Sequence, residues 1–122
     1  MEKKESIMIP ENLKGYDHIE EMYQELVNCP ERGEVLERTK YYRTGLDLEN
    51  GVVSLWDDSQ TLEVDIFNVN ALELMVALGV RTVDDMFKAV KERSLTLSSS
   101  FSEFLKDHGI QYSAYSSVPD YD

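Results

Sequence analysis

The sequence predicts an α+β fold with an N-terminal helix, a three-stranded antiparallel meander at about residues 39–67, and two to three helices that pack on the inner face of the sheet. Three observations predict this order. Apolar residues recur with a helical period before Pro30, alternate with a period of two after Thr39, and return to a helical period after about residue 70. The length of 122 residues suits one core, so we expect a single domain over residues 1–122.

The first helix is expected at about residues 18–28. The segment "YDHIEEMYQELVNCP" spaces its apolar side chains for one helix face; they are Ile19, Met22, Tyr23, Leu26 and Val27. Asp17 followed by Glu20 is typical of a helix N-terminus, and Pro30 disfavours helical geometry at the residue before it. A short strand at Ile7–Ile9 is expected upstream of this helix.

The meander is predicted from two turns. Asn50-Gly51 favours a type I′ hairpin turn, because that turn needs positive φ at both central residues. Folding about it places Leu46 opposite Leu55, and a second reversal at "DDSQ" (residues 57–60) places Leu55 opposite Leu62. Both registers put the same apolar residues on one face, and a one-residue slip would destroy that agreement; these residues are Leu46, Leu48, Val53, Leu55, Leu62 and Val64.

Three helices are expected after the meander. Asn70 is predicted to cap "ALELMVALG", which Gly79 ends and whose apolar character on nearly all sides places it in the core. Thr82 is predicted to cap a helix that begins at "VDDMFKAVKER". Ser100 is predicted to open a short third helix that Gly109 ends; "IQYSAY" should return as an edge strand before the tail "SSVPDYD".

Composition suggests an intracellular protein. Hydrophobic residues make up 42% of the chain and charged residues 30%, and no apolar run approaches the roughly 20 residues that a membrane span needs. The N-terminal segment lacks the apolar core of a secretory signal, and the single Cys29 cannot form an internal disulfide. We therefore expect a cytoplasmic protein, without a membrane partner, whose ends at about 1–10 and 116–122 are flexible.

The formal net charge of −12 favours basic partners and opposes direct binding of nucleic acid. The acidity is concentrated in residues 45–80, which contain no lysine or arginine. Their carboxylates are Asp47, Glu49, Asp57, Asp58, Glu63, Asp65 and Glu73. Like charges in one patch of a sheet cost stability, and a basic partner would relieve that cost.

A partner-binding surface is predicted on the outer face of the meander and its second turn. The register sends four carboxylates to that face, where they should be exposed. The predicted surface comprises Asp47, Glu49, Trp56, Asp57, Asp58, Glu63 and Asp65. An alternative interpretation is an ordinary solvated sheet face, since antiparallel sheets commonly expose one side to water.

Catalytic and metal-binding patterns find little support in the sequence. "DDSQ" does not match a calcium-binding loop, and the chain contains none of the hydrolase, phosphate-loop or zinc-protease motifs. His18 and His108 are predicted to lie at helix ends. We therefore expect no catalytic residues, no metal and no cofactor.

The functional hypothesis is a non-enzymatic acidic protein that blocks or neutralises a basic, nucleic-acid-binding protein. Small acidic proteins of this class include phage anti-restriction and anti-CRISPR inhibitors and the immunity proteins of nuclease toxins. The comparison is one of class, because no motif of the chain matches a particular family. Two alternatives remain: a structural or regulatory subunit that homo-oligomerises through an apolar helical surface, and an enzyme whose motif is not apparent.

Overall fold

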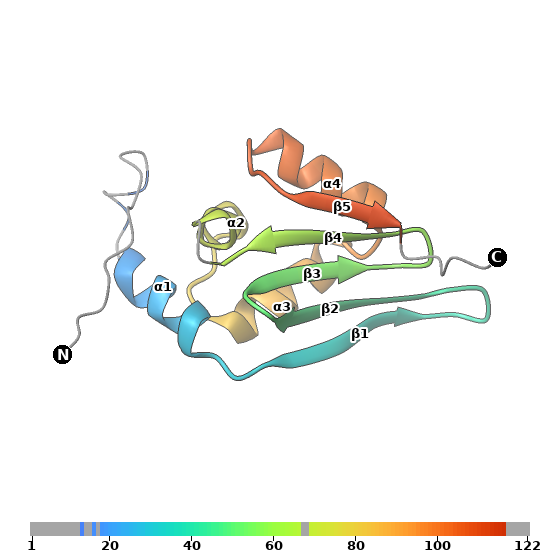
Figure 1. Cartoon of the computed structure of the whole chain (residues 1–122), viewed down its shortest axis with the longest axis horizontal. Helices are drawn as coiled ribbons and strands as arrows, with labels where there is room; N and C mark the ends of the chain where they lie inside the picture. The colour runs from blue at the N-terminus through green and yellow to red at the C-terminus, as the bar shows by residue number, and fades with distance from the viewer. Residues whose placement is uncertain (1–12, 14–15, 17, 67–68, 117–122) are drawn as a thin grey trace.

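The chain folds into one antiparallel sheet with helices on one side, as the computed structural model shows (Figure 1). The structure describes residues 13, 16, 18–66 and 69–116. The elements in chain order are α1 (Ile19–Asn28), β1 (Arg32–Arg38), β2 (Arg43–Glu49), β3 (Val52–Trp56), β4 (Gln60–Asp65), α2 (Asn70–Leu78), α3 (Val83–Glu92), α4 (Ser98–Asp107) and β5 (Ser113–Ser116). The strand Ile7–Ile9 and the cap Asp17, both predicted from the sequence, lie outside the described residues.

The registers predicted from the two turns are confirmed. Leu46 pairs with Leu55 and Leu55 with Leu62, so β2, β3 and β4 form the expected meander. Asn50 and Gly51 have φ angles of 58° and 79°, as a type I′ turn requires. The six apolar residues predicted for the inner face are all buried, and Leu55 on the central strand is fully so.

Within the described residues the sheet has five strands, so the prediction of three is incomplete. β1 pairs with β2 at one edge and β5 pairs with β4 at the other, both antiparallel. The apolar residues of β1 do not alternate with polar ones, so the sequence did not predict this strand. A bulge between Val35 and Glu37 breaks its register, and Leu36 is its one buried side chain. The edge strand expected within "IQYSAY" is confirmed as β5, all of whose residues are exposed.

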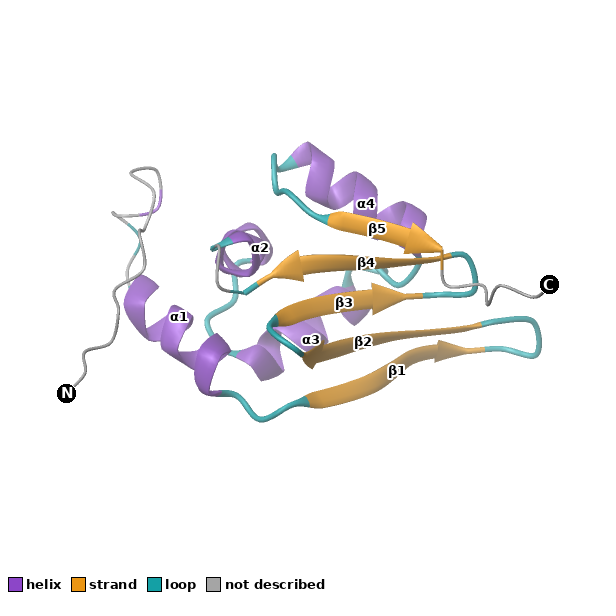
Figure 2. Ribbon diagram, viewed as in Figure 1, coloured by secondary structure: helices purple, strands orange, loops and turns teal. Residues whose placement is uncertain are grey.

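Three helices cover the inner face of the sheet, and α1 lies at one end of it (Figure 2). α2 packs against β4, α4 packs against β3 and β4, and α1 packs against α2. The core between the layers contains Phe101, Met75 and Met86 together with the inner residues of the strands.

Most of the predicted helix ends agree with the structure, and the predicted starts of α2 and α4 differ. Thr82 caps α3 by accepting a hydrogen bond from Asp85 N at 3.0 Å, and Gly79 ends α2 with a φ of 75°. The predicted cap Asn70 is instead the first residue of α2, after Val69 at a positive φ of 62°. α4 begins at Ser98 rather than Ser100, because Leu97 occupies the extended cap position and donates its N–H to Ser100 Oγ.

None of the helices in the described ranges is long and apolar enough to span a bilayer.

Candidate interaction surface on the outer sheet face

The outer face of the sheet carries no helix of the described residues (Figure 2). Because side chains alternate along a strand, this face presents every second residue of β2, β3 and β4. From the register, these residues are Arg43, Gly45, Asp47, Glu49, Val52, Ser54, Trp56, Thr61, Glu63 and Asp65. The face therefore includes four of the carboxylates predicted to lie there.

Trp56 is held in one orientation on this face. A Cβ built on Gly45 would lie 2.2 Å from Trp56 Cζ2, so the indole lies directly over the glycine. Its Nε1 donates a hydrogen bond of 3.1 Å to Asp47 Oδ2. Trp56 is partly exposed, as a binding residue fixed on a surface would be.

The prediction that Asp47 is exposed is wrong, because the indole partly covers it. Asp47 is half-buried between Gly33 and Trp56. Loss of solvent raises the pKa of the Asp47 carboxyl, although the hydrogen bond from Trp56 acts in the opposite direction. Asp47 is therefore the internal partner of Trp56 as well as a carboxylate of the outer face.

The remaining three carboxylates of the face differ in exposure. Glu49 is exposed, as predicted, whereas Glu63 and Asp65 are half-buried, so the prediction of full exposure is wrong for these two residues as well. Tyr115 of the edge strand β5 donates its hydroxyl to Glu63 Oε2 at 2.8 Å. Glu63 is half-buried because β5 lies beside β4. The sequence predicted an edge strand here but did not predict which strand it pairs with.

Asp57 belongs to the interior and not to the exposed surface predicted from the sequence. Its Oδ1 accepts the N–H groups of Ser59 and Gln60 at 2.8 and 2.9 Å, and its Oδ2 accepts the N–H of Ser98 at 2.7 Å. Burial raises the pKa of Asp57, but the hydrogen bonds outweigh it and the pKa lies below its usual value. Asp57 thus joins the β3–β4 turn to the start of α4, while its neighbour Asp58 is exposed.

The outer face has a basic end that the sequence analysis missed. Arg38 of β1 pairs with Arg43 of β2, and the parity of β2 places both on the outer face. The Arg43 guanidinium carbon lies 5.7 Å from the centre of the Trp56 ring, within range of a cation–π interaction. Both arginines precede residues 45–80, the segment in which the sequence concentrates its acidic residues, although both belong to the same sheet.

The acidic end of the face continues around the β2–β3 turn. Glu31 accepts the N–H of Asn50 at 3.3 Å, which places this glutamate beside the turn that follows Glu49. Figure 1 shows α1 at the same end of the molecule. We use the term acidic end for the side chains of Glu31, Glu49 and Asp65.

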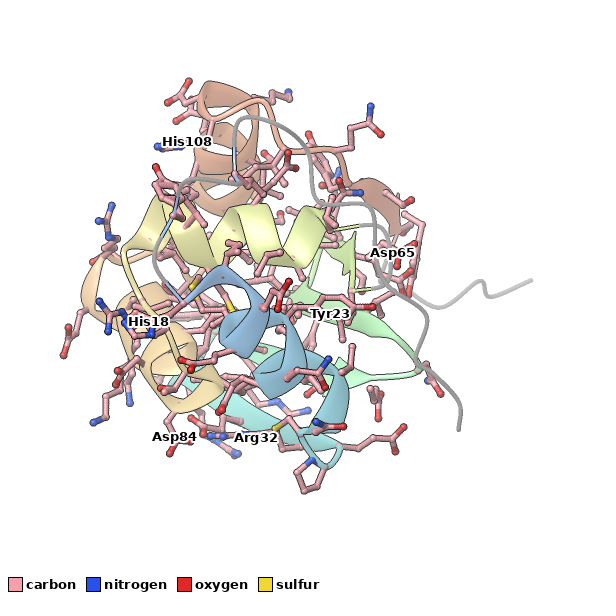
Figure 3. All side chains as sticks on the ribbon, turned by 90° about the vertical axis from the view of Figure 1, so that its left-hand side faces the viewer. His18, Tyr23, Arg32, Asp65, Asp84 and His108 are labelled. Atoms are coloured by element: carbon pink, nitrogen blue, oxygen red, sulfur yellow. The ribbon has the colours of Figure 1, made fainter. Side chains whose placement is uncertain are left out.

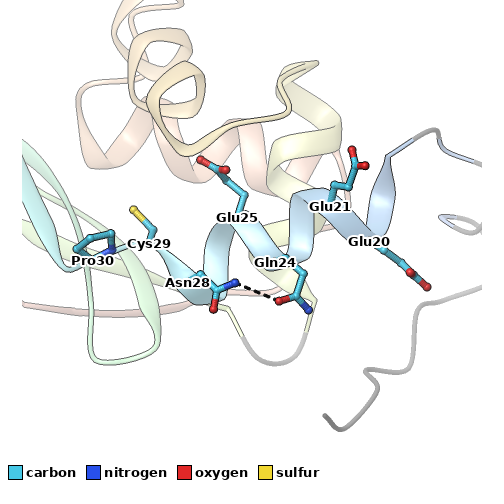
Figure 4. Close-up of a pocket in the computed structure, with 7 residues that line it drawn as sticks. All are labelled: Glu20, Glu21, Gln24, Glu25, Asn28, Cys29 and Pro30. Atoms are coloured by element: carbon cyan, nitrogen blue, oxygen red, sulfur yellow. Dashed lines mark hydrogen bonds between the residues drawn. The ribbon is translucent and has the colours of Figure 1, made fainter. Parts of the chain in front are cut away.

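A hollow of about 630 Å³ lies along the exposed side of α1 (Figure 4). Its lining residues are Glu20, Glu21, Gln24, Glu25, Asn28, Cys29 and Pro30. Glu25 is tied to α3, because its Oε2 accepts the N–H of Val83 at 3.2 Å. The three glutamates add negative charge to α1, which has no lysine or arginine.

Arg32 binds α3 to the sheet. Its guanidinium donates to Asp84 at 2.6 Å and to Glu34 at 2.5 Å, and it lies 4.3 Å from the centre of the Phe87 ring. Figure 3 labels Arg32 and Asp84 close together at the lower edge of the molecule. This arginine therefore has an internal role and does not neutralise the acidic end.

The two histidines lie at helix ends, as predicted, and far apart (Figure 3). His18 Nδ1 lies 2.8 Å from Glu21 Oε1, and His108 Nδ1 lies 3.0 Å from the Phe104 carbonyl oxygen. Within the ranges that the structure describes, no three His, Cys, Asp or Glu side chains converge as a metal site.

The fold and the surface together define an α+β protein with a one-sided five-stranded antiparallel sheet whose open face has a basic and an acidic end. The chain matches no family model, no curated protein and no solved structure.

Proposed function

We propose that the protein is a non-enzymatic binding protein whose acidic surface holds, and thereby blocks, a basic partner. The observation that carries this proposal is the open outer face, which presents Glu49, Glu63 and Asp65 on the same side of the sheet as a fixed tryptophan. The proposed partner is a nucleic-acid-binding protein. The Cα atoms of Glu63 and Asp65 are roughly 6.6–7 Å apart along β4, a separation of the same order as that of neighbouring phosphates on a nucleic-acid strand.

Electrostatics supports a partner of positive charge. The net charge of −12 would attract a basic protein over distances up to the screening length and would increase the rate of association. Glu49 and Asp58 make no ion pair within the described part of the chain, so their charges are available to a partner.

Trp56 supplies the second part of the proposed contact. Tryptophan is enriched among residues that dominate binding energy, especially where charged and apolar contacts meet. Its indole is already fixed over Gly45 by the hydrogen bond to Asp47, so binding would cost little side-chain entropy. A basic side chain of the partner would contact both the ring and the neighbouring carboxylates.

The alternative of homo-oligomerisation through the helices has less support. Three of the exposed large hydrophobic residues, Val35, Tyr41 and Tyr115, belong to the sheet or its hairpin loop. On the helical side, Leu97 at the start of α4 and Tyr16 beside α1 and α2 are exposed. A stable interface through apolar helices would need a larger patch than these two residues provide.

Two triple charge reversals test the proposal. The sheet variant carries Glu49→Lys, Glu63→Lys and Asp65→Lys, and the helix variant carries Glu92→Lys, Glu103→Lys and Asp107→Lys. Both make the same change in net charge, but the second set is exposed on α3 and α4. Each protein serves as bait in cell lysate, with washes of increasing salt, after circular dichroism has confirmed its fold.

We expect the wild type and the helix variant to retain a basic protein from the lysate. The sheet variant should lose it. The affinity of this basic protein for the purified wild type should fall steeply with salt, because charge pairs at the surface are screened. Close charge pairs contribute about 1.5–7 kcal/mol in strongly electrostatic complexes, so three reversals should abolish binding. A partner that both variants bind equally well would contradict the use of the outer face.

A further inference from the structure

Parts of the outer face are complementary to one another in size and charge. Two adjacent rows of residues cross all five strands on either side of Leu46 in β2. The first, which we call the aromatic row, comprises Val35, Gly45, Trp56, Thr61 and Tyr115. The second, the polar row, comprises Gly33, Asp47, Ser54, Glu63 and Ser113. On three of the five strands, a large residue of the aromatic row has a small neighbour in the polar row.

On β2, the charges beyond the two rows are also arranged as opposites. Arg43 follows the aromatic row on β2 with Arg38 beside it, whereas Glu49 follows the polar row on the same strand. Arg43 and Glu49 are six residues apart, so roughly 20 Å separates their Cα atoms and they cannot pair within one molecule. The face therefore has a positive and a negative end along the strand direction.

We infer that the outer face binds a second copy of the same chain. The two-fold axis would lie in the plane between the two sheets, perpendicular to the strands, and would pass over Leu46. This rotation places the aromatic row of each copy over the polar row of the other. The strands of two aligned sheets cross at about 30°, so the rows would cross at a similar angle. Trp56 then lies over Ser54 of the second copy, and Tyr115 lies over Ser113.

The same operation brings opposite charges together. Arg43 of each copy lies against Glu49 of the other, so the contact occurs twice in the dimer. Such an interface is isologous: the same surface is used on both copies and no further copies can add to it. The apolar side chains that become covered include Val35 and Tyr115, which are 43% and 52% exposed in the monomer.

The size of the face predicts a weak dimer. Five strands about 4.8 Å apart and four residue rows make a face of roughly 20 by 20 Å, so two copies would bury on the order of 1,000 Å² in total. This area is near the lower limit for specific interfaces. We therefore expect a dissociation constant on the order of micromolar and a monomer–dimer equilibrium rather than a permanent dimer.

The inference does not rest on the proposed function, although both concern the outer face. A second copy presents Arg43 where the proposed partner would present a basic side chain, so dimerisation and partner binding would exclude one another. Dimerisation is measured with the purified chain alone. Its failure is therefore distinguishable from failure of the proposed function.

The intrinsic fluorescence of Trp56 and sedimentation velocity test the inference on the wild type. The chain contains a single tryptophan, so its emission reports the burial of this residue alone. Across a dilution series from about 200 to 1 μM, we expect the dimer to dissociate and the emission of Trp56 to shift to longer wavelength over the same concentrations. A monomer at every concentration, or a dimer whose dissociation leaves the emission unchanged, would overturn the inference.

Charge exchange between two variants tests the two-fold axis. Arg43→Glu and Glu49→Arg each replace two attractive contacts by two repulsive ones, and each should weaken dimerisation by about tenfold or more. In an equimolar mixture, a heterodimer has opposite charges at both contacts, so the mixture should dimerise more tightly than either variant alone. The double variant with both substitutions should form a homodimer for the same reason.

The control is Lys88→Glu, which reverses one exposed charge on α3 and should leave the dimer unchanged. Circular dichroism and a thermal melt establish that each variant is folded. If Arg43→Glu dimerises as tightly as the wild type, or if the mixture of two folded variants remains monomeric, the proposed axis is wrong. If Arg43→Glu does not fold, the dilution series of the wild type still decides whether Trp56 lies in an interface.

Discussion

The indole of Trp56 lies over the backbone of Gly45 and donates its Nε1–H to Asp47 Oδ2 at 3.1 Å. These three residues belong to two neighbouring strands, where Gly45 pairs with Trp56 and Asp47 pairs with Ser54. The glycine provides the space and the carboxylate provides the acceptor. Together they fix the orientation of the chain's single tryptophan at the centre of the outer face.

Gly45→Ala is expected to destabilise the protein by about 1–3 kcal/mol, because the new methyl group would overlap the indole and must displace it. The added Cβ would also lie 2.9 Å from the Glu34 carbonyl oxygen, which cannot move as a side chain can. Urea unfolding with tryptophan emission measures both the stability and the displacement of Trp56.

Gly33→Ala is the matched control for this substitution. Its Cβ would meet Asp47 Oδ1, the end of a side chain that can turn away at the cost of its hydrogen bond from Trp56, whereas the backbone at Gly45 cannot move in this way. We expect a smaller loss of stability than at Gly45. If Gly33→Ala lost as much stability as Gly45→Ala or more, contact with the indole would not explain the effect of Gly45→Ala.

Glu63→Lys tests the tie between β4 and β5. Considered from the sequence alone, lysine at position 63 would attract the neighbouring Asp65, which predicts a neutral or mildly stabilising effect. The structure changes this expectation, since the substitution removes the acceptor of the Tyr115 hydroxyl. A hydrogen bond to a charged group contributes about 1.5–3 kcal/mol where it is shielded, and less for exposed residues such as Tyr115.

The expected result is therefore faster hydrogen exchange in β5, with little change in β2 and β3. Glu92→Lys serves as the control, because it makes the same change in charge at an exposed position of α3, away from the outer face. Unchanged protection of β5 in Glu63→Lys would mean that the strand is held by its backbone pairing alone.

Short-range signals predicted much of the fold. The Asn50-Gly51 turn and the second reversal each define a register, and both place Leu55 between Leu46 and Leu62. Thr82 and Gly79 mark helix ends through local conformation. Turns and helix caps depend on a few neighbouring residues, so they can be predicted from a single sequence.

The features that the sequence did not predict depend on tertiary contacts. β1 lacks alternation because its bulge places Leu36 inward, and only its pairing with β2 makes it a strand. Asp57 looks like an exposed turn residue until α4 packs beside it and Ser98 donates its N–H. Extending the alternation of β2 back to Arg43 would have revealed the basic end, since Arg43, Gly45 and Asp47 share one parity.

Leu55→Ala should destabilise the protein by about 2–5 kcal/mol, because it removes a fully buried side chain and leaves a cavity. Leu55 lies on β3, the central strand, with Leu46 and Leu62 on either side. Chemical denaturation measures the loss. Val52→Ala is the control at a partly exposed position of the same strand and should cost much less.

Asp57→Asn is expected to cost about 2–4 kcal/mol at neutral pH, because a neutral amide replaces an ionised acceptor of three backbone N–H groups. The loss should appear first at the start of α4, where Ser98 donates its N–H to this carboxylate. Hydrogen exchange of Ser98 and its neighbours identifies the site. Asp58→Asn is the matched control, since Asp58 adjoins Asp57 but is exposed.

The effect of Asp57→Asn should also depend on pH. The pKa of Asp57 is lower in the folded protein than in the unfolded chain, so the unfolded state binds the proton more readily. The stability that this carboxylate contributes is therefore fully present above the unfolded pKa of about 3.9, and is lost as the pH falls through the lower folded value. Denaturation of the wild type and Asp57→Asn between about pH 7 and 2 should show a constant difference in unfolding free energy that decreases only below about pH 4. A difference that remained constant to the acid limit would show that the charge of Asp57 does not stabilise the turn.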